Sequence, residues 1–517
     1  MLTTLTAPAF AGTWYIEDGD ITISAGESGN NVTQNNETTY GDTGTIITNH
    51  DKDKASSNTV TIDANGKNDK VEVTLKDVNI DASRGSEAAV SVTGKGDTTI
   101  ELDGDNELKS GAGHAGLEHN KTDTSGELTI QDKDNNGSLE AAGGFKGAGI
   151  GSAGSNDAQV KITGGNITAT SDDWGAGIGS GSYGTGTVEI TGGEINATGG
   201  YLGAGIGGGC NGSGNVTISG GTITAAGSDG AAGIGGGYYN GATVTITGDA
   251  VIKNASSTKY GAGIGGGNGS DGNVTISGNA KIENATGGYG AAGIGGGAFS
   301  SPDKIGNGNV VIKDNAKIDN VQGGAYGAGI GGGIYGLSNV TIEGNTKVNA
   351  TGGAGGAAIG GGAGAENNSD NNGNQITIKS NENGSPTINA VGGGTDEGEK
   401  IVIGGAGIGA GCESNADADI TLEGKVTITA TAGKDNVAIG ANGIEQEFSG
   451  LAEGSSITRY DPEGNDITLP TDPVPAVPSS SGGSSADASV QESVFPGLVV
   501  TDKDGQRISY TSIRGNN

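Results

Sequence analysis

Aromatic residues, cysteine and arginine are all scarce in this chain of 517 residues. Aromatic side chains make up 4% of it, which is too little bulk for a large conventional core. The two cysteines, Cys210 and Cys412, hold equivalent places six repeats apart. At strand spacing this separates them by about 29 Å, too far for an intrachain disulfide. No stretch is long and apolar enough to span a membrane.

Positive charge is scarce as well. Asp and Glu number 60 against 27 Lys and Arg, so the formal net charge is −33. This balance argues against nucleic acid and against an anionic membrane surface as partners, and it leaves cation binding possible. Arginine is absent between Arg84 and Arg459. A polysaccharide lyase needs a base, usually Arg or Lys, beside a charge neutraliser, and here scattered lysines would have to supply it.

Glycine is abundant, with 108 residues, and much of it belongs to one recurring phrase, Gly-Ala-Gly-Ile-Gly-Gly-Gly. Its isoleucine, called the marker below, returns mostly every 28 to 30 residues. A fixed period of this size is typical of a repeat architecture whose units cannot bury their apolar faces alone. Val90 and Leu117 hold the marker place in two degenerate copies, and the later markers are Ile150, Ile178, Ile206, Ile234, Ile264, Ile294, Ile330, Ile359, Ile408 and Ile439.

Two further phrases follow each marker in a constant order. After Ile206 come residues 216–218, Val-Thr-Ile, and residues 222–225, Thr-Ile-Thr-Ala. Both alternate with period two, as short strands do, and glycine pairs that favour turns divide them. Three strands per period, with no room for a helix, predict an all-β fold. We expect a parallel β-helix of about 12 coils of roughly 28–30 residues. Its right hand follows from the usual chirality of parallel crossovers.

The alternation also predicts which side chains face inward. The markers should stack into an apolar ladder, and glycines such as Gly205 and Gly207 should leave the outer face of that strand bare. In the third strand, Asn254, Asn284 and Asn320 take the place that alanine holds in other coils. We therefore expect an internal amide ladder there.

Aromatic residues flank the glycine strip on both sides. Flat rings along a bare floor could hold an extended glycan, because sugars present apolar faces, while neighbouring polar side chains supply hydrogen bonds. The alternative is that the rings only cover the edges of turns. The candidate carbohydrate-binding residues are Trp174, Tyr183, Tyr201, Tyr239, Tyr260, Tyr289, Tyr326 and Tyr335.

One loop resembles the first half of a calcium-binding loop. Residues 132–137, Asp-Lys-Asp-Asn-Asn-Gly, fit D-x-D-x-N-G, but Gly143 stands where the twelfth-position glutamate would be. Asp132, Asp134 and Asn136 are therefore candidate ligands of Ca²⁺, and a plain polar turn is the alternative. No other cofactor is expected.

The repeats also set the predicted boundaries. Residues 1–11 end in an Ala-x-Ala-like site and are interpreted as a signal-peptide remnant, with a disordered N-terminus as the alternative. Residues 12–85 should form an N-terminal cap and first coil, and 86–447 the regular β-helix. Residues 448–493 are interpreted as a Pro/Ser/Gly-rich linker and 494–517 as a partial C-terminal module or tail. This last segment holds a possible hairpin around Asp504-Gly505.

Several of these motifs together resemble a known family. The glycine phrase followed by Val-Thr-Ile-Ser-Gly-Gly, as at 216–221, and the early runs 73–80 and 100–106 carry the resemblance. They are similar to the glycine-rich parallel β-helix repeat proteins of the bacterial cell surface, often labelled carbohydrate-binding-domain-containing. The resemblance covers residues 15–445. It implies a right-handed β-helix of pectate-lyase-like shape, a secreted or surface location and, more weakly, glycan binding.

These observations lead us to expect a non-catalytic, adhesin-like rod that binds a polysaccharide or a host or cell-wall glycan. A structural stalk or filament subunit, self-associating through its glycine-rich sheet face, is the first alternative. A polysaccharide lyase or glycoside hydrolase is the second, since such enzymes share the architecture. The histidines give the enzyme alternative little support, because His114 and His119 are expected in solvent-exposed turns.

Overall fold

The computed structural model describes residues 11–299, 305–367, 373–394, 403–473, 500–501 and 507–508. The chain divides into two units, Met1–Val474 and Pro475–Asn517. Residues 1–10 of the predicted signal-peptide remnant and residues 474–493 of the predicted linker lie outside the described residues. In the second unit, β46 (Val500–Thr501) pairs antiparallel with β47 (Arg507–Ile508) on either side of Asp504-Gly505.

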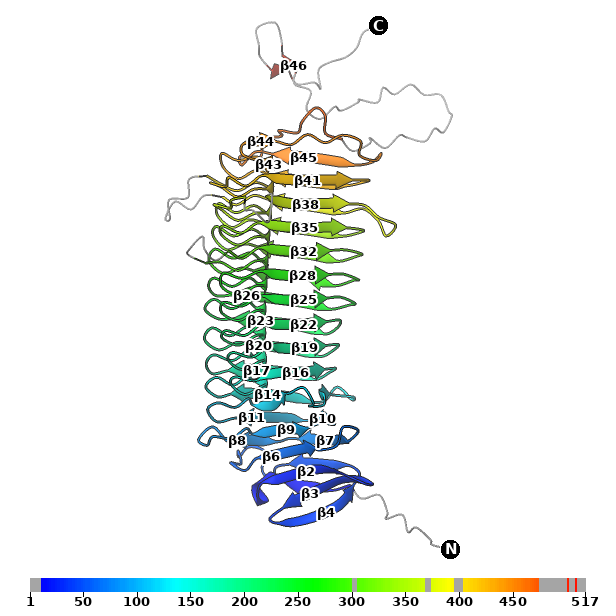
Figure 1. Ribbon diagram of the computed structural model, residues 1–517. Helices are drawn as coiled ribbons and strands as arrows, with labels where there is room; N and C mark the ends of the chain where they lie inside the picture. Colours follow the sequence, from blue (N-terminus) through cyan, green and yellow to red (C-terminus); the bar gives the residue numbers. More distant parts are fainter. Residues whose placement is uncertain are drawn as a thin grey trace, which may run out of the picture. The chain divides into compact units, whose positions relative to one another are not determined.

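The first unit is a right-handed parallel β-helix in which three ladders of strands run along one axis (Figure 1). The first ladder contains the markers: β2 (Ile21–Gly26), β6 (Val60–Ala64), β9 (Val90–Gly94), β12 (Leu117–Lys121), β15 (Ile150–Gly151), β18 (Ile178–Gly179), β21 (Ile206–Gly207), β24 (Ile234–Gly235), β27 (Ile264–Gly265), β31 (Ile294–Gly295), β34 (Ile330–Gly331), β37 (Ile359–Gly360), β40 (Ile408–Gly409) and β43 (Ile439–Ala441).

The second ladder contains β1 (Thr13–Tyr15), β5 (Thr45–Thr48), β7 (Lys70–Lys76), β10 (Asp97–Asp103), β13 (Leu128–Gln131), β16 (Asp157–Ile162), β19 (Gly186–Ile190), β22 (Gly214–Ile218), β25 (Ala242–Ile246), β28 (Gly272–Ile276), β32 (Gly308–Ile312), β35 (Ser338–Glu343), β38 (Asn374–Lys379) and β41 (Ala418–Glu423).

The third ladder is a separate sheet. It contains β8 (Asn79–Asp81), β11 (Asp105–Lys109), β14 (Ser138–Gly143), β17 (Asn166–Ser171), β20 (Glu194–Thr198), β23 (Thr222–Gly227), β26 (Val251–Ser257), β29 (Lys281–Ile282), β30 (Ala285–Thr286), β33 (Lys317–Gln322), β36 (Lys347–Thr351), β39 (Thr387–Val391), β42 (Thr427–Thr431) and β45 (Ser456–Tyr460).

The solenoid has about 14 turns rather than the 12 predicted. Parallel pairing begins near the N-terminus, where β2 pairs β6 and β1 pairs β5. These first turns are built from β2 and β6, neither of which contains the glycine phrase. A count of that phrase and its degenerate copies therefore misses them.

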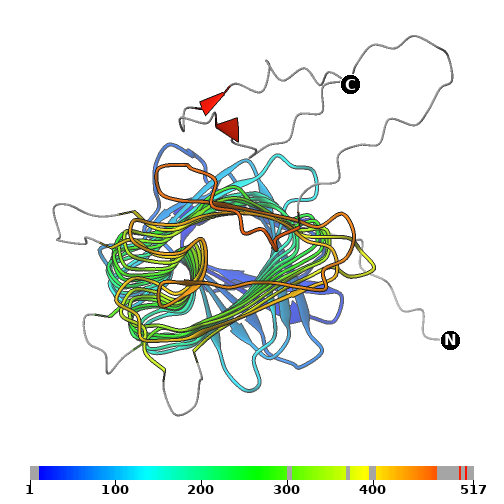
Figure 2. The same ribbon diagram turned by 90° about the horizontal axis from the view of Figure 1, so that it is seen from above.

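Each coil aligns its apolar residues with those of the next. Ile178 pairs in register with Ile206, Val188 with Val216 and Ile195 with Ile223. All the markers are fully buried, and one apolar cluster runs from Ile16 to Ile457. Seen along the axis, the coils stack into a ring with a smaller lobe on one side (Figure 2).

The glycines of the marker strands are buried, so the prediction of a bare outer floor is wrong. The chain bends at each marker, as the 2.9 Å bond from the Ala204 amide to the Gly208 carbonyl shows. Both neighbours of Ile206 therefore lie against backbone: a Cβ on Gly205 would meet the Gly233 carbonyl at 2.7 Å, and one on Gly207 would overlap the Gly235 carbonyl. The same burial removes the glycine face through which a filament subunit would have self-associated.

The asparagine ladder exists, but it lies outside the core rather than inside. Asn284 and Asn320 are exposed and Asn254 is half-buried, and Asn320 Nδ2 donates to Asn284 Oδ1 at 3.1 Å. Register shifts in β23–β26 and β33–β36 add a residue to these coils. A one-residue shift moves a strand residue to the opposite face. The inward places are taken instead by Ala255, Ala285 and Val321.

Both ends of the solenoid are covered. At the N-terminal end β2, β3 (Gly29–Gln34) and β4 (Glu37–Asp42) form an antiparallel cap, with the short 3₁₀ helix η1 (Ile16–Asp18) beside it. At the other end β44 (Ile444–Glu445) and β45 close the core, so the predicted linker does not begin at residue 448.

The C-terminal cap is held by a fully buried arginine. Arg459 Nε donates to Asp472 Oδ2 at 2.7 Å and Arg459 Nη2 to Asp472 Oδ1 at 3.0 Å, while Arg459 Nη1 pairs with Glu445. Phe448 packs against its guanidinium, with the ring centroid 5.7 Å away.

Candidate functional site

The turns before and after each marker meet along one line of the rod. The amide four residues after a marker donates to the carbonyl four residues before the previous marker. Cys210 N bonds Trp174 O at 2.7 Å in this way, Ala298 N bonds Tyr260 O at 2.7 Å, and Ala363 N bonds Tyr326 O at 2.8 Å. We call this line the seam. It brings the two predicted aromatic rows to the two sides of a single feature.

The predicted residues divide between the two sides of the seam. On the side before the marker lie Trp174, Tyr201, Tyr260, Tyr289 and Tyr326, and on the side after it lie Tyr183, Tyr239 and Tyr335. Tyr183 is 58% exposed, Tyr201 52% and Tyr289 43%, and the other five are half-buried. Every one of these rings can therefore be reached from solvent at least in part.

Three tyrosines from consecutive coils pack against one another. The ring centroids of Tyr260 and Tyr289 are 6.2 Å apart at 84°, and those of Tyr289 and Tyr326 are 5.6 Å apart at 71°. These are edge-to-face contacts, which add about 0.5–1.5 kcal/mol beyond burial. Earlier along the seam, Phe145 and Trp174 lie 5.3 Å apart. The rings thus support each other's orientation rather than standing singly.

Tyr238 was missed by the prediction and fills a gap in the row. The coil of Ile234 has a glycine, Gly230, where the next coil has Tyr260, and a Cβ there would lie 2.5 Å from Tyr238 Cδ2. The Tyr238 hydroxyl donates to the Tyr239 hydroxyl at 2.9 Å. Burial, followed by this bond and the nearby phenols, raises the Tyr238 pKa. The adjacent pair Tyr238-Tyr239 was the available signal.

With Tyr238 included, seven consecutive coils each contribute a ring to the seam. Their rings are Phe145, Trp174, Tyr201, Tyr238, Tyr260, Tyr289 and Tyr326.

Several of these aromatic residues have strained backbones. Tyr260 has φ of 63° and Tyr326 of 74°. Coils with glycine at that position adopt a similar conformation, with φ of 78° at Gly290 and 81° at Gly355. The left-handed region costs a non-glycine residue about 1–2 kcal/mol. The other candidates in this region are Trp174, Tyr183, Tyr239 and Tyr335. Lys146 and Leu202 hold the same place as Tyr260 with φ of 72° and 66°, so this conformation belongs to the turn and not to the aromatic residues alone.

The seam also holds polar atoms without partners. Asp173 Oδ1, Ser182 Oγ and Asn268 Oδ1 are buried and have no hydrogen-bond partner among the described residues. Burial, reinforced by Asp172, raises the pKa of the Asp173 carboxyl. Unpaired buried polar groups are costly, so bound water or a ligand hydroxyl is expected beside them.

Two lysines lie over seam rings. The Lys146 ammonium is 5.1 Å from the Trp174 ring centroid, and the Lys259 ammonium is 4.8 Å from that of Tyr260. Such cation–π contacts at exposed sites contribute about 0.5–1 kcal/mol. A sugar that stacks on these faces would have to displace a flexible, weakly held side chain.

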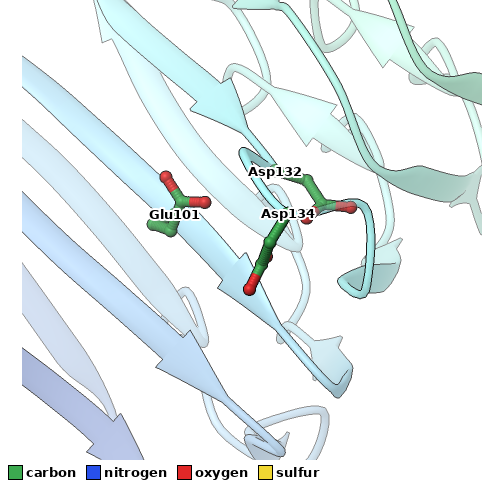
Figure 3. Close-up of side chains that lie close together, drawn as sticks. All are labelled: Glu101, Asp132 and Asp134. Carbon is green, nitrogen blue, oxygen red and sulfur yellow. The ribbon is translucent and has the colours of Figure 1, made fainter.

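The candidate calcium ligands Asp132 and Asp134 lie together with a third carboxylate. One carboxylate oxygen from each of Glu101, Asp132 and Asp134 lies within 4.8 Å of the others (Figure 3). This spread fits a cation with oxygen ligands at 2.3–2.6 Å. Glu101 comes from β10, one coil earlier, and was missed because it is remote in sequence. Its column neighbour is Gln131, which directly precedes Asp132.

Asn136 contacts this group through its nitrogen atoms. Its side-chain nitrogen donates to Asp134 Oδ2 at 3.1 Å, and its amide donates to Asp132 Oδ1 at 3.2 Å. Lys133 also lies close, with its ammonium 3.5 Å from Glu101 Oε2. A hollow of about 470 Å³ adjoins the cluster and is lined partly by Thr74, Thr99, Glu101 and Asp134.

The histidines differ from the prediction of exposed turn residues. His119 lies in β12 and is 2% exposed, with its Nδ1 3.0 Å from the Gln159 carbonyl. Burial lowers its pKa. His114 is half-buried and lies 2.8 Å from Glu118, which is itself 5% exposed.

Comparison with known proteins identifies the repeat. The family model of the beta helix repeat matches residues 160–182, 188–210, 216–238 and 274–298. No curated protein and no solved structure matches the chain. Over the described ranges, no helix has the length and apolarity needed to cross a bilayer. Together with the stacked coils, the matched repeats identify the chain as a parallel β-helix repeat protein.

Proposed function

We propose that this protein is a non-catalytic, adhesin-like rod that binds a polysaccharide or a host or cell-wall glycan along the seam. The observation that carries the proposal is that seven consecutive coils each place an aromatic ring there. Coils repeat about every 4.8 Å, so an extended polymer would meet rings at regular intervals. In this proposal the protein is secreted or surface-attached in a bacterium, in keeping with the family resemblance.

The chemistry of the seam supports a glycan rather than an apolar ligand. Sugars need apolar contact for their ring faces and polar partners for their hydroxyls. The tyrosine rings supply the first, and Asp173, Ser182 and Asn268 have unused polar atoms for the second.

The enzyme alternative finds no support in the arginine that closes the rod. Arg459 is fully buried and bound to Asp472 and Glu445, so it is not available to a substrate. We therefore propose no catalytic role for Arg459.

Retention of the full chain on a panel of insoluble and soluble polysaccharides tests the proposal. The variant is Tyr260→Gly/Tyr289→Ala/Tyr326→Gly, in which glycine relieves the strained positions so that the fold is preserved. The matched control is Tyr40→Ala, which removes a 75% exposed tyrosine from the N-terminal cap. We expect the triple variant to lose at least tenfold in affinity and the control to bind normally. Equal binding by the wild type, the triple variant and the control would rule out the seam as the binding site.

We also propose that Ca²⁺ binds at Glu101, Asp132 and Asp134. Calorimetric titration of the full chain with CaCl₂ should show binding that Glu101→Gln and Asp134→Asn each weaken at least tenfold. Asn136→Ala should bind Ca²⁺ as the wild type does, because the side chain of Asn136 meets Asp134 through its nitrogen and not through its oxygen. Loss of Ca²⁺ binding in Asn136→Ala but not in Glu101→Gln would instead support a site formed by residues 132–137 of the loop alone.

A further inference from the structure

Two outward columns of the second ladder are free of charge over six coils. From β22 to β38, the two outward positions that flank the central apolar residue carry only Asn, Thr, Gln and one Val. The chain as a whole has a net charge of −33, so this neutrality stands out. We call this surface the neutral face; it consists of Asn215, Thr217, Thr243, Thr245, Asn273, Thr275, Asn309, Val311, Asn339, Thr341, Gln375 and Thr377.

Charged side chains border the neutral face at both ends. Lys161 and Glu189 form an ion pair at 3.3 Å on the preceding coils. At the far end, Asp419 of β41 pairs in register with Gln375. Along one side, one position beyond the columns, lie Lys313 and the ion pair of Glu343 and Lys379, which are 3.3 Å apart. The neutral face is therefore a bounded patch on one side of the rod and not a property of the whole surface.

Hydrogen-bonded register aligns the patch into two straight columns. Thr217 pairs with Thr245 and Thr245 with Thr275, so these hydroxyls recur about every 4.8 Å along the rod. The columns are about 6.6 Å apart, the distance between alternate residues of a strand. Asn309 Nδ2 donates to Asn273 Oδ1 at 2.9 Å, so neighbouring amides also fix one another.

This arrangement suits a flat, neutral, hydroxyl-rich partner. Each hydroxyl or amide can both donate and accept a hydrogen bond, as sugar hydroxyls can. Threonine is stiff at χ1 and the strands are rigid, so little freedom is lost on binding. A shallow hollow of about 330 Å³ over β19, β22 and β25, lined in part by Thr187, Thr217 and Thr245, lies at one end of the patch. An acidic polymer would be repelled by the net charge.

We infer that the neutral face binds the surface of an insoluble, uncharged polysaccharide, as a second contact beside the seam. The inference rests on the proposed function for the class of ligand, but it concerns a different surface of the rod. The seam would hold a single glycan chain, while the neutral face would lie flat against ordered chains. Because no ion pair is involved, binding through this face should not depend on salt.

The test uses the full chain and three uncharged insoluble probes: microcrystalline cellulose, chitin and curdlan. Thr217→Val/Thr245→Val/Thr275→Val removes three hydroxyls and keeps the side-chain shape, and Val311 shows that the column accepts valine. The control Thr168→Val/Thr224→Val/Thr429→Val makes the same change at half-buried positions of the third ladder. The triple seam variant is measured beside them on the same probes and on soluble oligosaccharides.

We expect the neutral-face variant to lose roughly tenfold or more in affinity for at least one insoluble probe, at 50 mM and at 500 mM NaCl alike, while its control binds as the wild type. The inference would be overturned if the neutral-face variant bound every probe with the affinity of the wild type. It would also be overturned if none of the three probes retained the wild-type protein. Loss of soluble-glycan binding in the seam variant alone would uphold the proposed function while the neutral face fails. Loss of binding in the neutral-face variant alone would support the neutral face and count against the seam.

Discussion

At Gly207 the backbone adopts a conformation that ordinary side chains rarely take, with φ of +130°. Its Cα faces the carbonyl of Gly235 in the next coil, and Gly235 faces Gly265 in the same way. The close approach of these coils therefore depends on the absence of a Cβ. This requirement, rather than ligand access, explains why glycine follows each marker.

Gly207→Ala should destabilise the protein by about 1–3 kcal/mol or more, because it adds both strain and overlap with Gly235. Gly85→Ala is the control, since Gly85 is exposed and a Cβ there would meet only the Ala82 carbonyl at 3.4 Å. Urea unfolding of both variants is the measurement. A Gly207→Ala protein as stable as the Gly85→Ala protein would refute this role.

Residue patterns predicted the inward markers correctly and the outer glycine face wrongly. Period-two alternation assigns a residue to the outside only when the strand stays extended. The marker strands have two regular residues before the chain bends, so the Ile206 neighbours Gly205 and Gly207 turn into contact with adjacent coils. Alternation cannot reveal such a bend, because the hydrogen bond that closes it joins Ala204 to Gly208.

Among the elements, the C-terminal cap is the one that the sequence did not indicate. Its polar composition resembles a linker, yet β45 pairs with β42 and Arg459 is buried among acidic partners. A lone arginine gives no sign of burial until its carboxylates are found nearby. Here they lie 13 and 14 residues away, at Asp472 and Glu445.

Arg459→Met should open the C-terminal end of the rod. Removing one partner leaves Asp472 buried and unpaired, a change that costs about 3–5 kcal/mol. Repeat proteins lose structure locally, so hydrogen exchange should speed up first in β42 and β45 and little in the early coils. Arg84→Met, at an exposed position, should leave exchange unchanged. Uniform loss of protection along the rod would contradict a local capping role.

Burial of His119 in β12 makes stability depend on pH. Its pKa is lowered in the folded state, so below the usual value of 6.5 the unfolded chain binds the proton more readily. This contribution is present above pH 6.5 and is lost as the pH falls. Thermal melts from pH 7.5 to 5 should show a steeper decline in the wild type than in His119→Gln, which keeps an amide for the Gln159 carbonyl. Parallel declines would show that His119 does not titrate.

For the whole rod, the period of the repeat was enough to predict the fold. The stacking of the coils determines which residues meet at the candidate sites. Register brought Glu101 to Asp132 across one coil and placed Tyr238 over Gly230, and neither pairing is visible along the chain. Sequence did identify the flanking aromatic residues. It could not show that the two rows meet at one seam, because that depends on how the turns on either side of each marker close on each other.

Fluorescence of Trp174 tests the seam most directly. The chain has two tryptophans, and Trp14 lies in the N-terminal cap with its indole N–H bonded to Asp42 at 2.8 Å. Titration with a glycan retained in the polysaccharide panel should change the emission of the wild type, saturating over the concentrations at which it is retained. The change should disappear in Trp174→Phe. Saturating glycan that leaves the wild-type emission unchanged, or changes both proteins equally, would contradict binding along the seam.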